Sequence, residues 1–250
     1  MVEKKRLDVL LIEKGLEESR SKAAARIMAG QVVVNDQMID KPGTQVKADA
    51  HIRLKGKGLP FVSRGGLKIE GAFGHWPIPT ENRICLDVGA STGGFTDFLL
   101  QKGAQRVFAV DVGYGQLHWK LQTDERVTNM ERTHILKTTP DDFDETPDLC
   151  VMDVSFISVA KILPHLQTLL APKAELVILV KPQFELSAAE VGKGGIVRDA
   201  EKRQKALKSI CDKATELGLE IVGHMESPIQ GAEGNIEFLL YLKHDGEISV

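Results

Sequence analysis

The fold is decided by the stretch Leu86-Asp87-Val88-Gly89-Ala90-Ser91-Thr92-Gly93-Gly94-Phe95-Thr96, which predicts a strand, a glycine-rich turn and the start of a helix. Glycines let the backbone approach a ligand closely, and the first turn of a helix offers unpaired N–H groups and a positive dipole end. Asp111 follows roughly 20 residues later, at the end of the next predicted strand, where a carboxylate can accept hydrogen bonds from ribose hydroxyls. The turn therefore indicates a site for a carboxylate, a phosphate or a ribose.

Outward from this turn, apolar runs that are typical of buried strands alternate with helical patterns. Such alternation predicts a parallel sheet that is covered on both faces. The connection from Ser227 to Asn235 is too short for a crossover helix, so the last two strands should be antiparallel. We predict an α/β, Rossmann-like domain whose mostly parallel sheet ends in an antiparallel strand pair. The predicted strands are Ile84–Val88, Arg106–Val110, Val127–Met130, Leu149–Val154, Leu176–Val180, Glu220–His224 and Ile236–Leu242.

Two classes of ligand fit the glycine turn, namely dinucleotides and S-adenosylmethionine. The spacing of Gly89 from Gly93-Gly94 differs from GxGxxG, the motif begins with an acid at Asp87, and the predicted sheet ends in an antiparallel pair. These three features favour S-adenosylmethionine and a methyltransferase fold. A tight strand-to-helix turn without a ligand is the alternative.

Polar residues appear near the carboxyl ends of other predicted strands, where α/β sheets place their sites. Asp153 follows Leu149–Met152, Lys181 follows Leu176–Val180, and Glu237 falls inside the last predicted strand. A buried lysine needs a partner, and in its neutral form it can accept the proton of a hydroxyl that attacks a methyl group. The alternative is that Lys181 forms only a structural ion pair with Asp153 or Glu237. No cluster of ligands suggests a metal.

The N-terminal part, Arg6 to about Leu54, predicts a small α+β domain. A leucine stripe gives a first helix that ends at Gly15, and Ser19 or Ser21 caps a second helix that runs to about Ala29. Short strands follow at Gln31–Val34 and His51–Leu54, with Asn35-Asp36 as a turn before Met38-Ile39.

A change of composition predicts the boundary between the two domains. The stretch Lys55–Pro60 is rich in glycine and lysine and has no periodicity, and a helix is expected near Leu67–Phe73. We predict a first domain over residues 1–58, a linker over 59–66 and a second domain over 67–250.

Charge is distributed unevenly along the 250 residues. Residues 1–60 hold 12 Lys and Arg against 8 Asp and Glu, a net charge of +4, whereas the whole chain has a net charge of −3. A basic head suggests a polyanionic partner, and an unevenly charged solvated surface is the alternative. The three cysteines lack CxxC spacing, and no segment suggests a signal peptide or membrane span. We expect a cytoplasmic protein without a membrane partner.

The residues carry a resemblance to known families. The N-terminal Arg6-Leu7-Asp8, Glu18 to Ala24 and Ile27 to Asn35 resemble an S4 RNA-binding domain. The remainder is similar to the FtsJ/RrmJ ribose 2′-O-methyltransferases. The two parts, joined by Phe61-Val62-Ser63-Arg64-Gly65-Gly66-Leu67-Lys68, together resemble the TlyA family of rRNA methyltransferases, whose members are often labelled haemolysins.

The resemblance implies a Lys-Asp-Lys-Glu catalytic tetrad made of Lys68, Asp153, Lys181 and Glu237. Lys181 would activate the hydroxyl, Asp153 and Glu237 would hold Lys181, and Lys68 would orient the substrate. S-adenosylmethionine is the implied cofactor and a cytidine 2′-hydroxyl of ribosomal RNA the implied acceptor, in naked rRNA or in ribosomal subunits. The expected cofactor contacts are Asp87, Gly89, Ala90, Ser91, Gly93, Gly94, Phe95 and Asp111, and the expected RNA contacts are Arg6, Arg20, Lys22, Arg26 and Arg64.

Two other functions are compatible with the family resemblance. A membrane-active haemolysin would need a bilayer-spanning or lipid-binding segment, which the acidic second part does not offer. A non-catalytic RNA-binding protein could keep the methyltransferase fold, but the complete tetrad argues against it. The sequence therefore favours an RNA methyltransferase.

Overall fold

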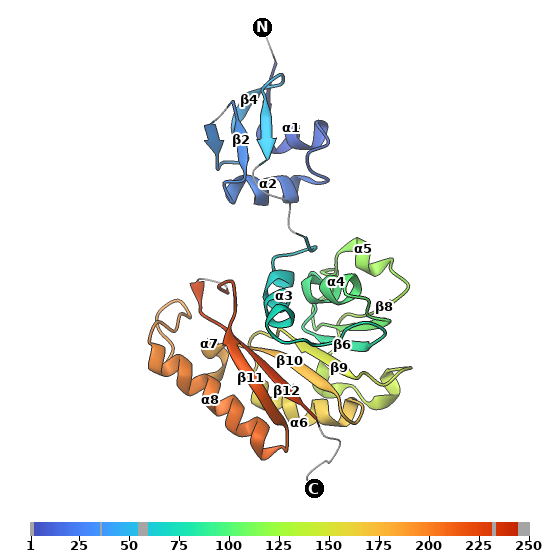
Figure 1. The fold of residues 1–250 in the computed structure, drawn as a ribbon. Helices are drawn as coiled ribbons and strands as arrows, with labels where there is room; N and C mark the ends of the chain where they lie inside the picture. The colour runs from blue at the N-terminus through green and yellow to red at the C-terminus, as the bar shows by residue number, and fades with distance from the viewer. Residues whose placement is uncertain (1–2, 36, 55–59, 232–233, 245–250) are drawn as a thin grey trace. The chain divides into compact units, whose positions relative to one another are not determined.

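The computed structural model describes residues 3–35, 37–54, 60–231 and 234–244, and the chain divides into two compact units, Met1–Pro60 and Phe61–Val250 (Figure 1). Most of the expected linker belongs to the second unit, because the division falls between Pro60 and Phe61. The glycine- and lysine-rich residues 55–59 lie outside the described residues, as does Asp36 of the expected Asn35-Asp36 turn.

The first unit is a small α+β domain. Helix α1 (Leu7–Glu13) and helix α2 (Arg20–Met28) pack on one another, and Ser19 caps α2 by accepting a hydrogen bond from the Lys22 N–H. Strands β3 (Gln37–Ile39), β2 (Val32–Val34) and β5 (Ile52–Leu54) form an antiparallel sheet in that order, and β1 (Lys4–Arg6) pairs with β4 (Gln45–Lys47). The core contains Leu7, Leu10, Leu11, Ala23, Ile27, Val32, Val34, Val46 and Ala50.

The second unit is built on a seven-stranded sheet. The strands are β6 (Ile84–Val88), β7 (Arg106–Val110), β8 (Val127–Met130), β9 (Leu149–Met152), β10 (Glu175–Val180), β11 (Glu220–Glu226) and β12 (Phe238–Lys243). Their order is β11-β12-β10-β9-β6-β7-β8, and β12 is antiparallel to both of its neighbours. The predicted mostly parallel sheet with a final antiparallel pair is confirmed, and the last strand lies between the two that precede it.

Helices cover both faces of this sheet (Figure 1). Alternate residues of each buried strand point to opposite faces, so within β10 Ile178 joins one core cluster and Leu179 the other. One cluster includes residues of α6 (Val159–Leu169) and α8 (Ala200–Glu216), and the other includes residues of α3 (Gly65–His75), α4 (Gly94–Gln101) and α5 (Trp119–Gln122). The short helix α7 (Pro182–Glu185) directly follows β10. The sheet thus has the two-sided burial that its continuous apolar strands predict.

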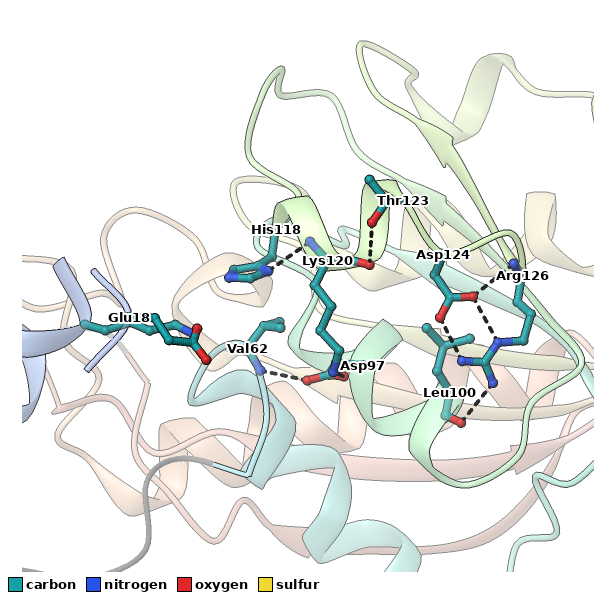
Figure 2. Close-up of polar contacts among 10 residues, drawn as sticks. Glu18, Val62, Asp97, Leu100, His118, Lys120, Thr123, Asp124 and Arg126 are labelled. Carbon is teal, nitrogen blue, oxygen red and sulfur yellow. Dashed lines mark hydrogen bonds and ion pairs between the residues drawn. The ribbon is translucent and has the colours of Figure 1, made fainter. Parts of the chain in front are cut away.

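Residues at the start of the second unit are fixed to α4. Phe61 is buried and packs against Phe98 with ring centroids 5.7 Å apart. The Val62 N–H donates to Asp97 Oδ2 at 2.8 Å, and Lys120 Nζ donates to Asp97 Oδ1 at 3.1 Å (Figure 2). The buried Asp97 carboxylate therefore holds the segment that leads into α3.

No helix among the described residues combines the length and the apolar character that crossing a bilayer requires.

Candidate active site

The site lies at the carboxyl ends of β6 and β9. These neighbouring strands mark the point where the strand order reverses, which is where open α/β sheets bind ligands. A cleft of about 1080 Å³ opens there, and a second cavity of about 240 Å³ shares Gly89, Ser91, Asp153 and Ser155 with it. The large cleft has room for a nucleoside-sized cofactor together with part of a substrate.

The glycine turn between β6 and α4 is shaped by close contacts. Gly89 has φ of 84°, and a Cβ atom there would lie 2.3 Å from the Asp153 carbonyl oxygen. Gly93 has φ of 91°, and a Cβ there would lie 2.2 Å from Leu121 Cδ1. Glycine meets both requirements, so the end of β6 can lie against the residue that follows β9, and the start of α4 can lie against α5.

The expected cofactor residues occupy three kinds of position. Gly89, Ser91 and Asp111 line the large cleft. Ala90, Gly94 and Phe95 line the smaller cavity. Asp87 and Gly93 line neither of these cavities and support the turn from beneath.

Asp111 fits the role of a ribose acceptor. Its carboxylate accepts hydrogen bonds from the Ser91 N–H at 2.8 Å and from the Gly113 N–H at 2.7 Å. Each carboxylate oxygen has a second lone pair, so acceptor capacity remains on the side that lines the cleft. The glycine turn and Asp111 together suit an adenosine-containing ligand.

Asp87 is a buried carboxyl group beneath the turn. Its side chain is inaccessible to solvent and accepts a hydrogen bond from Thr96 Oγ1 at 2.6 Å. Desolvation raises the pKa of Asp87 to about 7, even though the Thr96 hydrogen bond opposes the shift. The folded protein therefore retains a proton here at pH values where the unfolded chain has lost it.

This raised pKa gives Asp87 a testable effect on stability. From about pH 4 to about pH 7 the folded state binds more protons than the unfolded state, so the free energy of unfolding should fall as pH rises through that window. The Asp87→Asn variant lacks this titration. Its Tm minus the wild-type Tm should increase from about pH 5 to about pH 8, measured by thermal denaturation. Parallel Tm curves for the two proteins would contradict the assignment.

The four residues of the expected tetrad come together, and two of them, Asp153 and Lys181, line the smaller cavity. Asp153 follows β9, Lys181 follows β10, and Lys68 lies near the start of α3. Lys181 Nζ is 2.5 Å from Asp153 Oδ1, Lys68 Nζ is 3.4 Å from Asp153 Oδ2, and Lys68 Nζ is 2.7 Å from Glu237 Oε2. The ion pairs form a chain in which Asp153 bridges the two lysines.

Glu237 differs from its expected role and place. It lies just before β12 rather than inside it, and its ion pair is with Lys68 rather than Lys181. Because β12 runs antiparallel to β10 with Phe238 opposite Val180, the amino end of β12 meets the carboxyl end of β10 at the site. The Glu237 side chain is only 2% exposed, so it neutralises the Lys68 ammonium in a desolvated position.

Several residues of the site carry no clear signal in the sequence. Ser155 accepts a hydrogen bond from Lys181 Nζ at 3.0 Å. Phe156 is 92% exposed with φ of 65°, and its ring centroid is 5.1 Å from that of Phe184. Gln183 also lines the large cleft. The only hint of these residues is that they lie two or three positions after Asp153 or Lys181 in the chain.

The expected RNA contacts of the first unit are involved in ion pairs. Arg6 and Arg20 both pair with the buried Asp8, and the Arg6 hydrogen bonds in particular lower the pKa of Asp8 to about 2. Lys22 pairs with Glu18. Arg26 pairs with Glu17 and is only 14% exposed, so it is the least accessible of the four. In the second unit, exposed Arg64 donates to the Gln230 carbonyl oxygen at 2.9 Å.

The strand order, the glycine turn and the acid after β7 define the fold class of S-adenosylmethionine-dependent methyltransferases. A solved structure from Listeria monocytogenes that carries an S-adenosylmethionine-dependent methyltransferase name shares the fold at 13% identity with a TM-score of 0.55, over 73% of this chain and 99% of its own. Residues 61–244 match the family of FtsJ-like methyltransferases, to which this chain belongs, and residues 5–52 match the S4 domain.

Relatives cover nearly the whole chain. The 16S/23S rRNA (cytidine-2′-O)-methyltransferase TlyA of Mycobacterium tuberculosis is 42% identical over 97% of this chain and 91% of its own length. Hemolysin A of Brachyspira hyodysenteriae is 44% identical over 94% of this chain and 98% of its own. A solved structure from Streptococcus thermophilus that also carries a haemolysin name is 44% identical, with a TM-score of 0.77 over 98% of this chain and 90% of that chain.

Proposed function

We propose that this chain transfers the methyl group of S-adenosylmethionine to the 2′-hydroxyl of a cytidine in ribosomal RNA. The observation that carries the proposal is the chain of ion pairs Lys181–Asp153–Lys68–Glu237 beside the glycine turn. The relative named for cytidine 2′-O-methylation of 16S and 23S rRNA supports the choice of acceptor. The three cysteines are unpaired thiols, which supports a reducing cytoplasm as the place where the protein works.

The residues present fit the cofactor. The glycine turn brings the backbone to the edge of the cleft, and Asp111 offers acceptors for the ribose hydroxyls. When bound, S-adenosylmethionine supplies an electrophilic methyl group on a sulfonium. Residues Gly89, Ser91 and Asp111 would hold it from the side of the large cleft, and Gly94 and Phe95 from the smaller cavity.

The tetrad then acts on the acceptor hydroxyl. Lys181 in its neutral form accepts the proton that the hydroxyl loses. Asp153 holds Lys181 in place, and Lys68, neutralised by Glu237, orients the substrate. Fixing the hydroxyl in line with the methyl group supplies much of the rate, up to about 7–11 kcal/mol in well-oriented reactions.

The wall of the large cleft offers a surface for the target base. Phe156 is almost fully exposed, and its left-handed backbone conformation is unfavourable for a residue with a Cβ atom. Phe156 and Phe184 lie close together beside Lys181, so their rings can receive a base that leaves its stack in the RNA. Exposed aromatic groups at this position favour a nucleic acid over a small molecule as methyl acceptor.

The proposal is tested by transfer of tritium from labelled S-adenosylmethionine to deproteinised rRNA, to 30S subunits and to 50S subunits. Nucleoside analysis of the product should show 2′-O-methylcytidine. Absence of label in every form of rRNA would overturn the proposed function.

We further propose that the first unit binds RNA phosphates through Arg20 and Lys22. Both lie on α2 and both remain accessible, with side chains 62% and 39% exposed. The Arg20→Ala/Lys22→Ala double variant should bind rRNA more weakly and should reduce the salt dependence of log Kd by about one unit per lost contact, as measured by filter binding. Phosphate contacts confer affinity rather than choice of sequence, so weakening should be similar for different RNAs.

Arg26→Ala is the matched control for this prediction. Because Arg26 is mostly buried against Glu17, its loss should lower the free energy of unfolding and leave the salt dependence unchanged. If log Kd depends equally on salt concentration in the double variant and the wild type, Arg20 and Lys22 do not contact RNA phosphates.

A further inference from the structure

Ser155 is a partner of Lys181 that lies outside the tetrad. Its Oγ accepts a hydrogen bond from Lys181 Nζ at 3.0 Å. The side chain lines both the large cleft and the smaller cavity, so it lies where the two cavities meet. The position that Glu237 was expected to take beside Lys181 is thus taken by a hydroxyl group.

The number of hydrogen-bond acceptors around Lys181 matches the number of N–H bonds of a neutral amine, and Ser155 supplies one of these acceptors. A neutral amine has two N–H bonds and one lone pair, arranged roughly as a tetrahedron around nitrogen. Asp153 Oδ1 at 2.5 Å and Ser155 Oγ at 3.0 Å are the acceptors that lie within reach of Lys181 Nζ among the residues described. Two acceptors for two N–H bonds leave the remaining direction, that of the lone pair, to the substrate.

A single acceptor would not fix the lone pair. With the Asp153 ion pair alone, the amine could rotate about the Cε–Nζ bond while keeping that contact, and the lone pair would point toward the hydroxyl for only part of the time. Water can enter from the two cavities that Ser155 lines and take the place of the missing partner, but a mobile water molecule does not hold the N–H bond in one direction. Proton transfer requires the base within hydrogen-bond reach and correctly oriented, so this rotation would slow the reaction.

We infer that Ser155 is a positioning residue for the methyl transfer, which with Asp153 fixes both N–H bonds of neutral Lys181 and aims its lone pair at the ribose hydroxyl. The inference rests on the proposed function. The 2′-oxygen bonds to the methyl carbon, the carbon–sulfur bond breaks, and the hydroxyl proton becomes the third N–H of Lys181. Ser155 keeps its hydrogen bond and Asp153 keeps its ion-pair contact throughout, so the amine does not reorganise as it becomes an ammonium.

The test compares Ser155→Ala and Ser155→Thr with the wild-type full chain in steady-state methyl transfer. Ser155→Ala should lower kcat about 10-fold, the effect of losing one orienting hydrogen bond, and should leave the KM for rRNA, the Kd for S-adenosylmethionine and the Tm unchanged. Ser155→Thr keeps the hydroxyl and should recover most of the rate. Ser209→Ala, on the exposed face of α8, is the matched serine control and should behave as wild type.

The double variant Lys181→Ala/Ser155→Ala separates positioning from a merely structural role. Because Ser155 acts through Lys181, its loss should not slow the Lys181→Ala enzyme any further. Equal kcat for Ser155→Ala and wild type, or the same 10-fold loss in the Lys181→Ala background, would overturn the inference while leaving the proposed function intact. A wild-type protein that labels no form of rRNA would instead refute the proposed function.

Discussion

Lys181→Ala should reduce methyl transfer to rRNA by roughly 10²–10⁴-fold while S-adenosylmethionine still binds with unchanged Kd. The substitution removes the group that we propose accepts the hydroxyl proton, but Gly89, Ser91 and Asp111, which line the large cleft, remain in place. The rate is measured as tritium incorporated in a single turnover, and the Kd by calorimetry. A lower rate of methyl transfer with an unchanged Kd for S-adenosylmethionine would identify Lys181 as a catalytic rather than a cofactor-binding residue.

Lys181→Arg distinguishes proton acceptance from charge. A guanidinium keeps the positive charge beside Asp153 but remains protonated in proteins, so this variant should be about as inactive as Lys181→Ala. Lys208→Ala, on α8 and paired with Asp212, controls for loss of a surface lysine and should retain wild-type activity. Equal labelling by the wild type and Lys181→Ala would show that Lys181 plays no part in the chemistry.

Gly94→Ala should damage both stability and catalysis, because the start of α4 touches the start of α3. A Cβ atom at Gly94 would lie 2.4 Å from Ser63 Oγ and 2.8 Å from the Gly66 backbone nitrogen. Relieving this overlap requires a backbone shift, which costs about 1–3 kcal/mol of the free energy of unfolding in well-packed interiors. The shift would also displace Lys68, which lies in the first turn of α3, and lower kcat.

Gly74→Ala is the matched control for this prediction. Gly74 is also a helical glycine, in α3, but nothing lies within 4 Å of a Cβ atom placed there. The change should be neutral or should stabilise the protein by up to about 1 kcal/mol, because alanine favours helix over glycine. Chemical denaturation of both variants checks the pair, and a Gly94→Ala protein as stable and active as Gly74→Ala would contradict the proposed contact.

The sheet of the second unit could be predicted because its strands are buried on both faces. Burial on both sides produces continuous apolar runs such as Leu176–Val180, and their ends coincide closely with those of β10. The strands of the first unit are harder to predict, because β1 and β4 are only three residues long and have mostly polar side chains. Such strands depend on pairing with one another, which leaves no periodic signal in the sequence.

For the tetrad too, the sequence predicts the residues but not the contacts between them. The family resemblance identified Lys68, Asp153, Lys181 and Glu237, and the structure brings all four together. Which carboxylate meets which lysine depends on the register between β10 and β12, which is a tertiary property. For the same reason Ser155 could not be recognised, since a serine in a loop gains its role only from the lysine that folds against it.

The position of β12 sets when, during synthesis, the four residues of the tetrad can come together. Lys68 and Glu237 are separated by 169 residues, and Glu237 reaches Lys68 only when the last strand has inserted between β10 and β11. Domains tend to fold in order from the N-terminus as a chain emerges from the ribosome. The first unit can therefore fold and bind RNA before the second unit holds a complete tetrad. RNA binding by a nascent or truncated chain would then precede any methyl transfer.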